Sequence, residues 1–202
     1  MTQVILARLY DMMPHKQRLL SALPEPYQKK ALRYVQEKDQ VRSAVGSLLI
    51  GRFVSLESIK IGARGKPYAP DGPCFNISHA GDYIGIIVGD DDVGIDIEEV
   101  SRCNLGIVKA AFTDEEALVI RDCHDLAKAW TIKEAVGKCL GEGLLMPREN
   151  GVKSDMEGRY IYKEKTFYLR CFEHLGHAFA FAKRSPFDEL TIDVIGVDRL
   201  LQ

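Results

Sequence analysis

The alternation of hydrophobic and polar residues predicts where the strands of this chain lie. Several segments alternate with a period of two or form short apolar runs, bounded by Gly, Pro, Asp or other turn-forming residues. Such segments are typical of β-strands. The predicted strands are residues 3–9, 74–78, 83–88, 93–99, 160–163, 166–173, 177–183 and 190–197. The Gly-Asp-Asp-Asp sequence at 89–92 predicts that the strands on either side of it form a hairpin.

A period of 3.6 residues predicts the longer helices. From Asp39 onward, apolar or small side chains recur at the i, i+3, i+4, i+7 and i+8 positions that form the core-facing stripe of a helix. A second long helix is predicted over residues 124–140, with its end near Gly141 and Gly143. Residues 113–116 have the sequence Thr-Asp-Glu-Glu, a capping box that predicts the start of a shorter helix.

Helices followed by two strands occur twice along the chain. The stretch that contains Asp96 and Glu98 is similar to a second stretch near the C-terminus, where Asp193 corresponds to Asp96 but Ile195 replaces Glu98. The chain is therefore expected to have an α+β fold of two similar halves related by a pseudo-twofold, each a small antiparallel sheet packed on a long helix. The predicted halves are residues 1–100 and 101–202. Because the second half lacks one acid, a single site is expected.

Composition excludes several classes of protein. The 27 Lys and Arg residues nearly balance the 29 Asp and Glu residues, so bulk attraction to nucleic acid or membranes is not expected. No segment approaches 18 consecutive apolar residues, and the N-terminal apolar run is too short for a signal peptide. The five widely spaced cysteines form no C-x-x-C motif and indicate reduced cytoplasmic thiols. His174 and His177 form an H-x-x-H at a predicted turn, and we interpret them as surface residues rather than metal ligands.

Two acids of the strand at 93–99 share one face. Asp96 and Glu98 are two positions apart, which on a strand separates them by about 6.5–7 Å. At an effective dielectric constant near 20, their charges repel by about 2–3 kcal/mol, and the strand contains no Lys or Arg. Two interpretations remain open from these residues alone. The acids form either the solvated face of a half-buried strand or a binding site for a hard divalent cation.

Two further groups of residues carry candidate chemistry. Trp130, Glu134 and Lys138 share one face of the predicted helix. Glu134 and Lys138 form either an exposed ion pair or part of a site, and Trp130 is expected in the core. Ser78 and His79 end a strand just before a glycine, where side chains and backbone donors can converge on an anion. A group of basic residues could contact a polyphosphate or form a solvated basic helix face. The group consists of Lys29, Lys30, Arg33, Arg42, Arg64 and Lys66. Three carboxylates with a basic set predict Mg²⁺-dependent transfer or hydrolysis at a diphosphate.

Five short motifs occur in one order along the chain. They are G-K-P at 65–67, F-N-I-S-H at 75–79, G-I-D-I-E at 94–98, F-T-x-x-E at 112–116 and W-T-I-K-E-A-x-x-K at 130–138. With them, about residues 1–185 of the chain resemble the 4′-phosphopantetheinyl transferases, specifically the monomeric type that activates surfactin synthetase. Each motif alone is weakly specific, but five in this order and spacing are not expected by chance.

The resemblance implies an enzyme that transfers the 4′-phosphopantetheine arm of coenzyme A to a serine of an acyl or peptidyl carrier protein. Adenosine 3′,5′-bisphosphate is the second product. The resemblance further implies that Asp96, Glu98 and Glu134 bind Mg²⁺, with Mn²⁺ as a substitute. Glu134, directly or through a metal-bound water, would be the base for the carrier serine. Lys138 and Lys133 would stabilise charge on the diphosphate.

The resemblance also implies how coenzyme A is held. His79, Lys30 and Arg42 would contact its 3′-phosphate. Lys66 with its loop would flank the adenine, and Ser78 would be a further contact. The family places its active site between two similar halves, which agrees with the repeat in this chain.

The expected partners are coenzyme A and an apo carrier protein of fatty-acid, polyketide or nonribosomal-peptide synthesis, without nucleic acid or membrane. The protein is expected to be a cytoplasmic monomer. The family docks its carrier on the stretch after the strand acids, here 101–112, whose apolar residues could instead form the core of a short helix. Two alternatives are a metal-dependent phosphohydrolase that uses water and a module that binds coenzyme A or a carrier without chemistry. The hydrolase would turn over coenzyme A without a carrier, and the module would not require three acids and Lys138.

Overall fold

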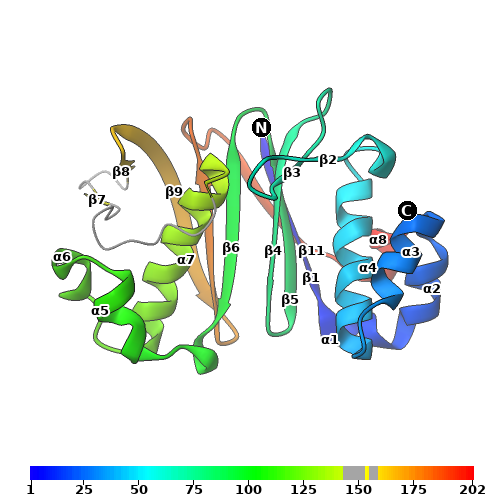
Figure 1. Cartoon of the computed structure of the whole chain (residues 1–202), viewed down its shortest axis with the longest axis horizontal. Helices are drawn as coiled ribbons and strands as arrows, with labels where there is room; N and C mark the ends of the chain where they lie inside the picture. The colour runs from blue at the N-terminus through cyan, green and yellow to red at the C-terminus, as the bar shows by residue number, and fades with distance from the viewer. Residues whose placement is uncertain (143–152, 155–158) are drawn as a thin grey trace.

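The computed structural model describes residues 1–142, 153–154 and 159–202, and its strands form two sheets and a short ribbon (Figure 1). The first sheet has the order β11-β1-β5-β4 and consists of β11 (Leu190–Val194), β1 (Thr2–Arg8), β5 (Tyr83–Gly89) and β4 (Cys74–Ala80). The second sheet has the order β6-β10-β9-β8-β7 and consists of β6 (Val93–Glu99), β10 (His177–Lys183), β9 (Lys165–His174), β8 (Arg159–Tyr162) and β7 (Lys153–Ser154). The ribbon consists of β2 (Lys60–Ile61) and β3 (Pro67–Tyr68).

Most of the helices precede the central strands of each half of the sequence, and the short α8 follows the last strand. In the first half they are α1 (Leu9–Met12), α2 (Lys16–Ser21), α3 (Glu25–Leu32) and α4 (Glu37–Gly51), with 3₁₀ turns η1 (Met13–His15) and η2 (Leu56–Ser58). In the second half they are η3 (Val100–Arg102), η4 (Leu105–Ile107), α5 (Val108–Ala111), α6 (Asp114–Ala117), α7 (Cys123–Leu140) and α8 (Val197–Leu200). Within the described ranges, none of these helices is long and apolar enough to span a membrane.

The elements stack as helix, sheet, sheet and helix. Helices α1–α4 and α8 cover the outer face of the first sheet, on the right of Figure 1, and α7 covers the outer face of the second. The core between α4 and the first sheet includes Val41, Val45, Leu49, Ile84 and Ile86. The core between the two sheets includes Val4, Leu6, Ile87, Ile95, Ile97, Phe179 and Phe181. The core under α7 includes Ile132, Ala135, Val136, Phe167, Leu169 and Ala180.

The predicted α+β class, the two long helices and the capping box at Thr113 are confirmed. The predicted hairpin of 83–88 with 93–99 is wrong, because β5 and β6 lie in different sheets. Both edges of β5 are taken by β1 and β4, and β6 pairs with β10 instead. The expectation of purely antiparallel sheets is wrong for the first sheet, because β11 returns from the second half and pairs with β1 in parallel.

The interpretation of the H-x-x-H motif is half correct. His174 is exposed at the end of β9. His177, at the start of β10, has only 7% of its surface exposed and is therefore not a surface residue. Its ring faces the first sheet and lies 5.0 Å from the ring of Tyr83, centroid to centroid.

Candidate active site

Helix α7 lies directly against β6, and a glycine makes this contact possible. A Cβ atom at Gly94 would lie 2.0 Å from the carbonyl oxygen of Ala135 and 2.5 Å from the backbone nitrogen of Cys139, so no larger residue fits. On the other side of β6, the side-chain oxygen of Asn76 accepts a hydrogen bond from the backbone nitrogen of Ile95 at 3.1 Å. The strands β4 and β6 and the helix α7 therefore meet along one line, which we call the seam.

Asp96 on β6 is buried in the seam, with 4% of its surface exposed. Its Oδ1 atom accepts hydrogen bonds from Ser78 Oγ on β4 at 3.0 Å and from Lys138 Nζ on α7 at 2.5 Å. Lys138 Nζ also donates to Ser78 Oγ at 2.9 Å. The solvated-face interpretation is therefore wrong for Asp96. The positive charge that answers this acid comes from the helix packed on the strand.

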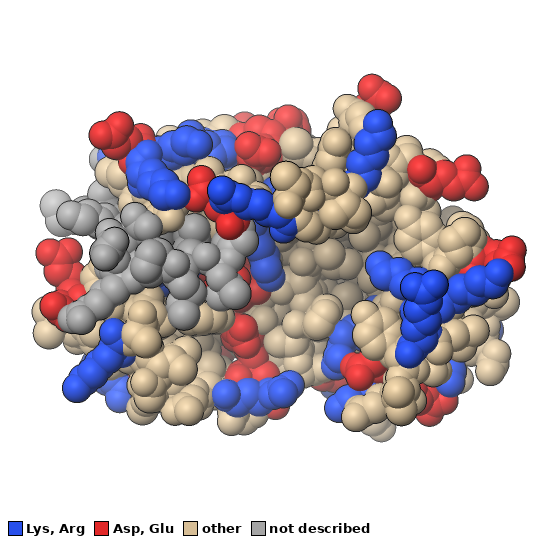
Figure 2. Space-filling view, viewed as in Figure 1, with Lys and Arg blue, Asp and Glu red and all other residues tan. Residues whose placement is uncertain are grey.

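Glu98 on β6 and Glu134 on α7 are half-buried, and the negative charge of Asp96 acts on both of them. Burial and the charges of Asp96 and Glu134 raise the pKa of Glu98 to about 7, although Lys138 and a hydrogen bond from Trp130 act in the opposite direction. Burial and the charge of Asp96 also raise the pKa of Glu134. The three predicted metal ligands therefore lie near enough for their charges to act on one another. Figure 2 shows acidic side chains near the middle of the face in view, with basic side chains on either side.

An unpartnered carboxylate oxygen lies at the centre of this group. Asp96 Oδ2 is buried and has no hydrogen-bond partner within the described residues. Buried polar atoms normally have a partner, and carboxylate oxygens are the ligands that Mg²⁺ prefers. The residues of the seam therefore fit a hard divalent cation. Within 1–142, 153–154 and 159–202, no group of three or more His, Cys, Asp or Glu side chains lies close enough together to hold a metal ion as the side chains now stand.

Beyond Ser78, basic side chains lie near one another at the end of the seam. Burial, followed by the charges of Arg42 and Lys138, lowers the pKa of His79 on β4. Arg42 on α4 forms an ion pair with Asp39 and donates through Nη2 to the carbonyl oxygen of Gly81 at 3.4 Å. A bound phosphate would relieve the repulsion among these cationic groups through charge-assisted hydrogen bonds.

Lys30 and Lys66, two further predicted cations, lie on different elements. Lys30 is exposed on α3, which packs on α4. Lys66 lies at the opposite end of the seam, where its Nζ donates to the carbonyl oxygens of Val93 and Cys139, each at 3.2 Å. Lys66 therefore ties the loop between β2 and β3 to both β6 and α7.

The structure does not bring Lys133 to the carboxylates. Its side chain is buried on the opposite side of α7, where Nζ donates to the Ala111 carbonyl oxygen at 2.7 Å and to Glu116 Oε2 at 2.9 Å. The ammonium group also lies over the ring of Phe112, 4.6 Å from its centroid. Because Glu116 closes the capping box with Thr113, Lys133 anchors α5 and α6 to α7.

Three residues of the site have roles that the sequence does not predict. The sequence predicts Asp39 only as the start of a helix, but its position three residues before Arg42 is the spacing of a helical ion pair. Gly94 lies inside the G-I-D-I-E motif, and the close packing of α7 explains why this position requires a glycine. Trp130, expected in the core, is half-buried and hydrogen-bonds Glu98 while packing edge-on against Phe112 at 6.2 Å.

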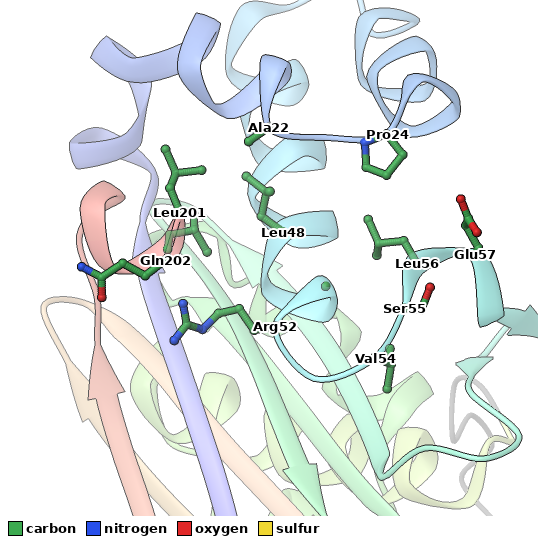
Figure 3. Close-up of a pocket in the computed structure, with 12 residues that line it drawn as sticks. Ala22, Pro24, Leu48, Arg52, Val54, Ser55, Leu56, Glu57, Leu201 and Gln202 are labelled. Atoms are coloured by element: carbon green, nitrogen blue, oxygen red, sulfur yellow. The ribbon is translucent and has the colours of Figure 1, made fainter.

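A cavity of about 650 Å³ opens elsewhere on the first half of the chain, between the α2–α3 turn, the end of α4, η2 and the C-terminal residues (Figure 3). Its wall includes Leu48, Arg52, Leu56 and Leu201. Arg52 lies at the opposite end of α4 from Arg42, and no predicted site residue lines this cavity. The seam, and not this cavity, contains the candidate chemistry.

Comparison with known proteins agrees with this geometry. Residues 92–183, which contain β6, α7 and all three acids, match the model of the 4′-phosphopantetheinyl transferase superfamily. The 4′-phosphopantetheinyl transferase gsp of Aneurinibacillus migulanus is 30% identical over 161 residues, 72% of this chain and 68% of the relative. The transferase ffp of Bacillus subtilis is 28% identical over 172 residues, and Sfp of Bacillus subtilis strain 168 is 28% identical over 173. Both alignments cover 77% of each chain.

Proposed function

This chain belongs to the 4′-phosphopantetheinyl transferase superfamily and is an enzyme of that class, and from this premise we propose its substrates and the roles of its residues. The proposed reaction transfers the phosphopantetheine arm of coenzyme A to a serine of an acyl or peptidyl carrier protein. The observation that carries the proposal is the convergence of Asp96, Glu98, Glu134 and Lys138 on one seam. Pure binding of coenzyme A would not require three mutually repelling acids.

In the proposed reaction, the serine oxygen of the carrier forms a bond to the phosphorus that bears the pantetheine arm. The bond from that phosphorus to the bridging oxygen breaks, and adenosine 3′,5′-bisphosphate leaves with the electron pair. Glu134 accepts the serine proton, directly or through a water molecule. Lys138 stabilises negative charge on the diphosphate. A bound Mg²⁺, or Mn²⁺ as a substitute, would be held by Asp96, Glu98 and Glu134 and would neutralise charge on the diphosphate.

The anion-binding end of the seam would hold the nucleotide of coenzyme A. Arg42 and His79 support a 3′-phosphate contact, because the charge of Arg42 acts on His79 and Arg42 is paired with Asp39 alone among the acids that the structure describes. Lys30, exposed on the neighbouring helix, would extend a long side chain to the same phosphate. Lys66 would hold its loop beside the adenine rather than contact the diphosphate, since its ammonium group is bonded to two backbone carbonyls.

A carrier protein would dock on residues 101–112, next to the acids. Leu105 and Ile107 have 44% and 38% of their surfaces exposed, and the neighbouring Arg102 and Lys109 are also exposed. Phe112, by contrast, is buried in a separate small cluster with Ala111 and Leu126. The stretch therefore combines an anchored end with an exposed basic and apolar part, which suits an acidic, partly apolar carrier helix.

We also propose that the chain consists of two halves, 1–100 and 101–202, related by a pseudo-twofold. The packing of one long helix on one sheet in each half supports this symmetry. The last strand of each half, β6 and β11, joins the sheet of the other half, which would interlock the two. The free state of the cysteines supports action in the cytoplasm. The resemblance of the motifs to the monomeric type of the family supports a monomer.

Intact-mass spectrometry of an apo carrier tests the proposed function. Incubation with the protein, coenzyme A and Mg²⁺ should raise the carrier mass by one phosphopantetheine group and release adenosine 3′,5′-bisphosphate in equal amount. A carrier whose serine is replaced by alanine is the control and should remain unchanged. Turnover of coenzyme A without a carrier would instead favour a hydrolase. Binding of coenzyme A without any product, across a panel of carriers, would contradict the transfer.

A further inference from the structure

His177 reaches from the second sheet to a turn of the first. Its Nδ1 atom lies 2.9 Å from the carbonyl oxygen of Leu175, and its Nε2 atom lies 3.4 Å from the backbone nitrogen of Asp82. Because a carbonyl oxygen only accepts, Nδ1 carries the hydrogen of the neutral ring and Nε2 accepts from Asp82. The ring therefore joins the β9–β10 turn to the β4–β5 turn, two segments that are far apart in the sequence.

The β4–β5 turn is shaped to admit this ring. Gly81 has φ +51°, a left-handed conformation that favours glycine. A Cβ atom at this position would lie 2.3 Å from His177 Nε2 and 2.8 Å from Glu99 Oε2. The imidazole is thus in direct contact with the turn. It also forms a T-shaped contact with the ring of Tyr83, with the two ring centroids 5.0 Å apart.

The same turn determines where the anion-binding groups lie. His79 is two residues before Gly81, at the end of β4. Arg42 Nη2 donates to the Gly81 carbonyl oxygen. A shift of the turn would therefore move His79 directly and would remove a contact that orients Arg42. Asp82 anchors the turn independently through its Oδ1 atom, which accepts from the Tyr10 backbone nitrogen at 2.6 Å, so loss of the ring should shift the turn without unfolding it.

We propose that His177 is a positioning residue that sets the preference of this enzyme for a donor with a 3′-phosphate over the same donor without it. The proposal rests on the proposed function, in which His79 and Arg42 bind that phosphate. His177 touches neither the reacting atoms nor the phosphate. It acts through the turn, so its effect should be confined to the part of binding energy that comes from the 3′-phosphate.

The test compares kcat/KM for coenzyme A and for dephospho-coenzyme A in four proteins. His177→Phe keeps an aromatic ring against Tyr83 but has no acceptor for Asp82, and His174→Phe on the neighbouring strand is the matched control. Wild type and His79→Ala complete the set. We expect His177→Phe to lower the ratio of the two kcat/KM values roughly two- to tenfold, the worth of one ordinary hydrogen bond, through KM for coenzyme A. His174→Phe should keep the wild-type ratio.

The outcomes separate the two proposals. A merely structural loss reduces the active fraction and lowers kcat on both donors equally, so an unchanged ratio in His177→Phe overturns the positioning role. If His79→Ala lowers kcat/KM by the same factor for coenzyme A and for dephospho-coenzyme A, relative to wild type, the assignment of the 3′-phosphate site itself is wrong. If His177→Phe does not fold, His177→Gln replaces it, because its amide can still donate to Leu175 and accept from Asp82. That variant should recover most of the wild-type ratio, and a ratio as low as in His79→Ala would contradict the role of these hydrogen bonds.

Discussion

Lys138 and Asp96 meet across the seam, with Nζ 2.5 Å from Oδ1, although they are 42 positions apart in the sequence. The carboxylate is almost fully buried and the side chain of the lysine is 27% exposed. Burial raises the pKa of Asp96, against the opposing effect of Lys138. The lysine therefore holds in place a buried acid whose second oxygen has no hydrogen-bond partner in the part of the chain that the structure describes.

Asp96→Ala should nearly abolish transfer and should also lower stability. Loss of one partner of a buried pair leaves the other charge uncompensated, and we expect a loss of about 1–3 kcal/mol because Lys138 remains partly solvated. Urea denaturation measures this loss. Asp193→Ala is the matched control, since Asp193 is the corresponding acid of the similar C-terminal stretch but is 41% exposed. Its stability should change by no more than about 0.5 kcal/mol. Near-normal transfer by both Asp96→Ala and Glu98→Ala at saturating Mg²⁺ would refute the metal assignment.

Glu134→Gln should depress turnover more than coenzyme A binding. The substitution keeps an oxygen that can bind a metal but removes the basicity needed to accept the serine proton. Steady-state kinetics with an apo carrier, together with a direct titration of coenzyme A, separates the two effects. A loss that lies entirely in affinity would mean that Glu134 is a metal ligand and not the base.

Lys133→Met should affect stability far more than coenzyme A binding. The buried ammonium group bonds Glu116 and the Ala111 carbonyl, and hydrogen bonds to charged groups are worth about 1.5–3 kcal/mol each. Thermal or urea unfolding measures the loss, and Lys128→Met on the exposed face of the same helix is the control. Lys138→Met should instead impair transfer. If Lys133→Met raised KM for coenzyme A as much as Lys138→Met, the earlier prediction of a diphosphate contact would be restored.

His79→Ala should weaken coenzyme A by roughly ten- to a hundredfold, because a charge-assisted bond to phosphate is worth about 1.5–3 kcal/mol. Dephospho-coenzyme A should be almost unaffected, since the lost contact has no partner there. Measurement of kcat/KM on both donors completes the cycle. Equal losses on both donors would show that His79 supports the fold or the acids instead.

The protonation of His79 should depend on the ligand. In the free protein its pKa is lowered from 6.5 by burial, Arg42 and Lys138, so the unfolded chain binds this proton more tightly. Stability contributed by the neutral ring is therefore present above the unfolded value and decreases as pH falls through 6.5 toward the folded pKa. A bound phosphate favours the protonated ring and should raise the pKa. NMR titration with and without adenosine 3′,5′-bisphosphate measures the shift, and a pKa that falls on binding would contradict the contact.

The sequence alone determined most of the local elements and the family, and it singled out the three acids as candidates. Periods of two and 3.6 residues, the capping box at Thr113 and the spacing of Glu134 and Lys138 follow from backbone geometry, so they are readable without a partner. The motifs at 94–98 and 130–138 carry the resemblance because their chemistry is concentrated in a few neighbouring residues.

Only the tertiary structure decided which elements meet. Strand pairing depends on which edges are free, so β6 joins β10 although its neighbour in sequence is β5. Successive residues on a helix are turned by about 100°, and only the packing of α5 and α6 shows that Lys133 faces away from Glu134. Burial is likewise a property of the assembled sheets. It places Asp96 beneath Lys138 and His177 beneath Gly81, whereas the sequence left Asp96 open between a solvated face and a cation site and predicted His177 at the surface.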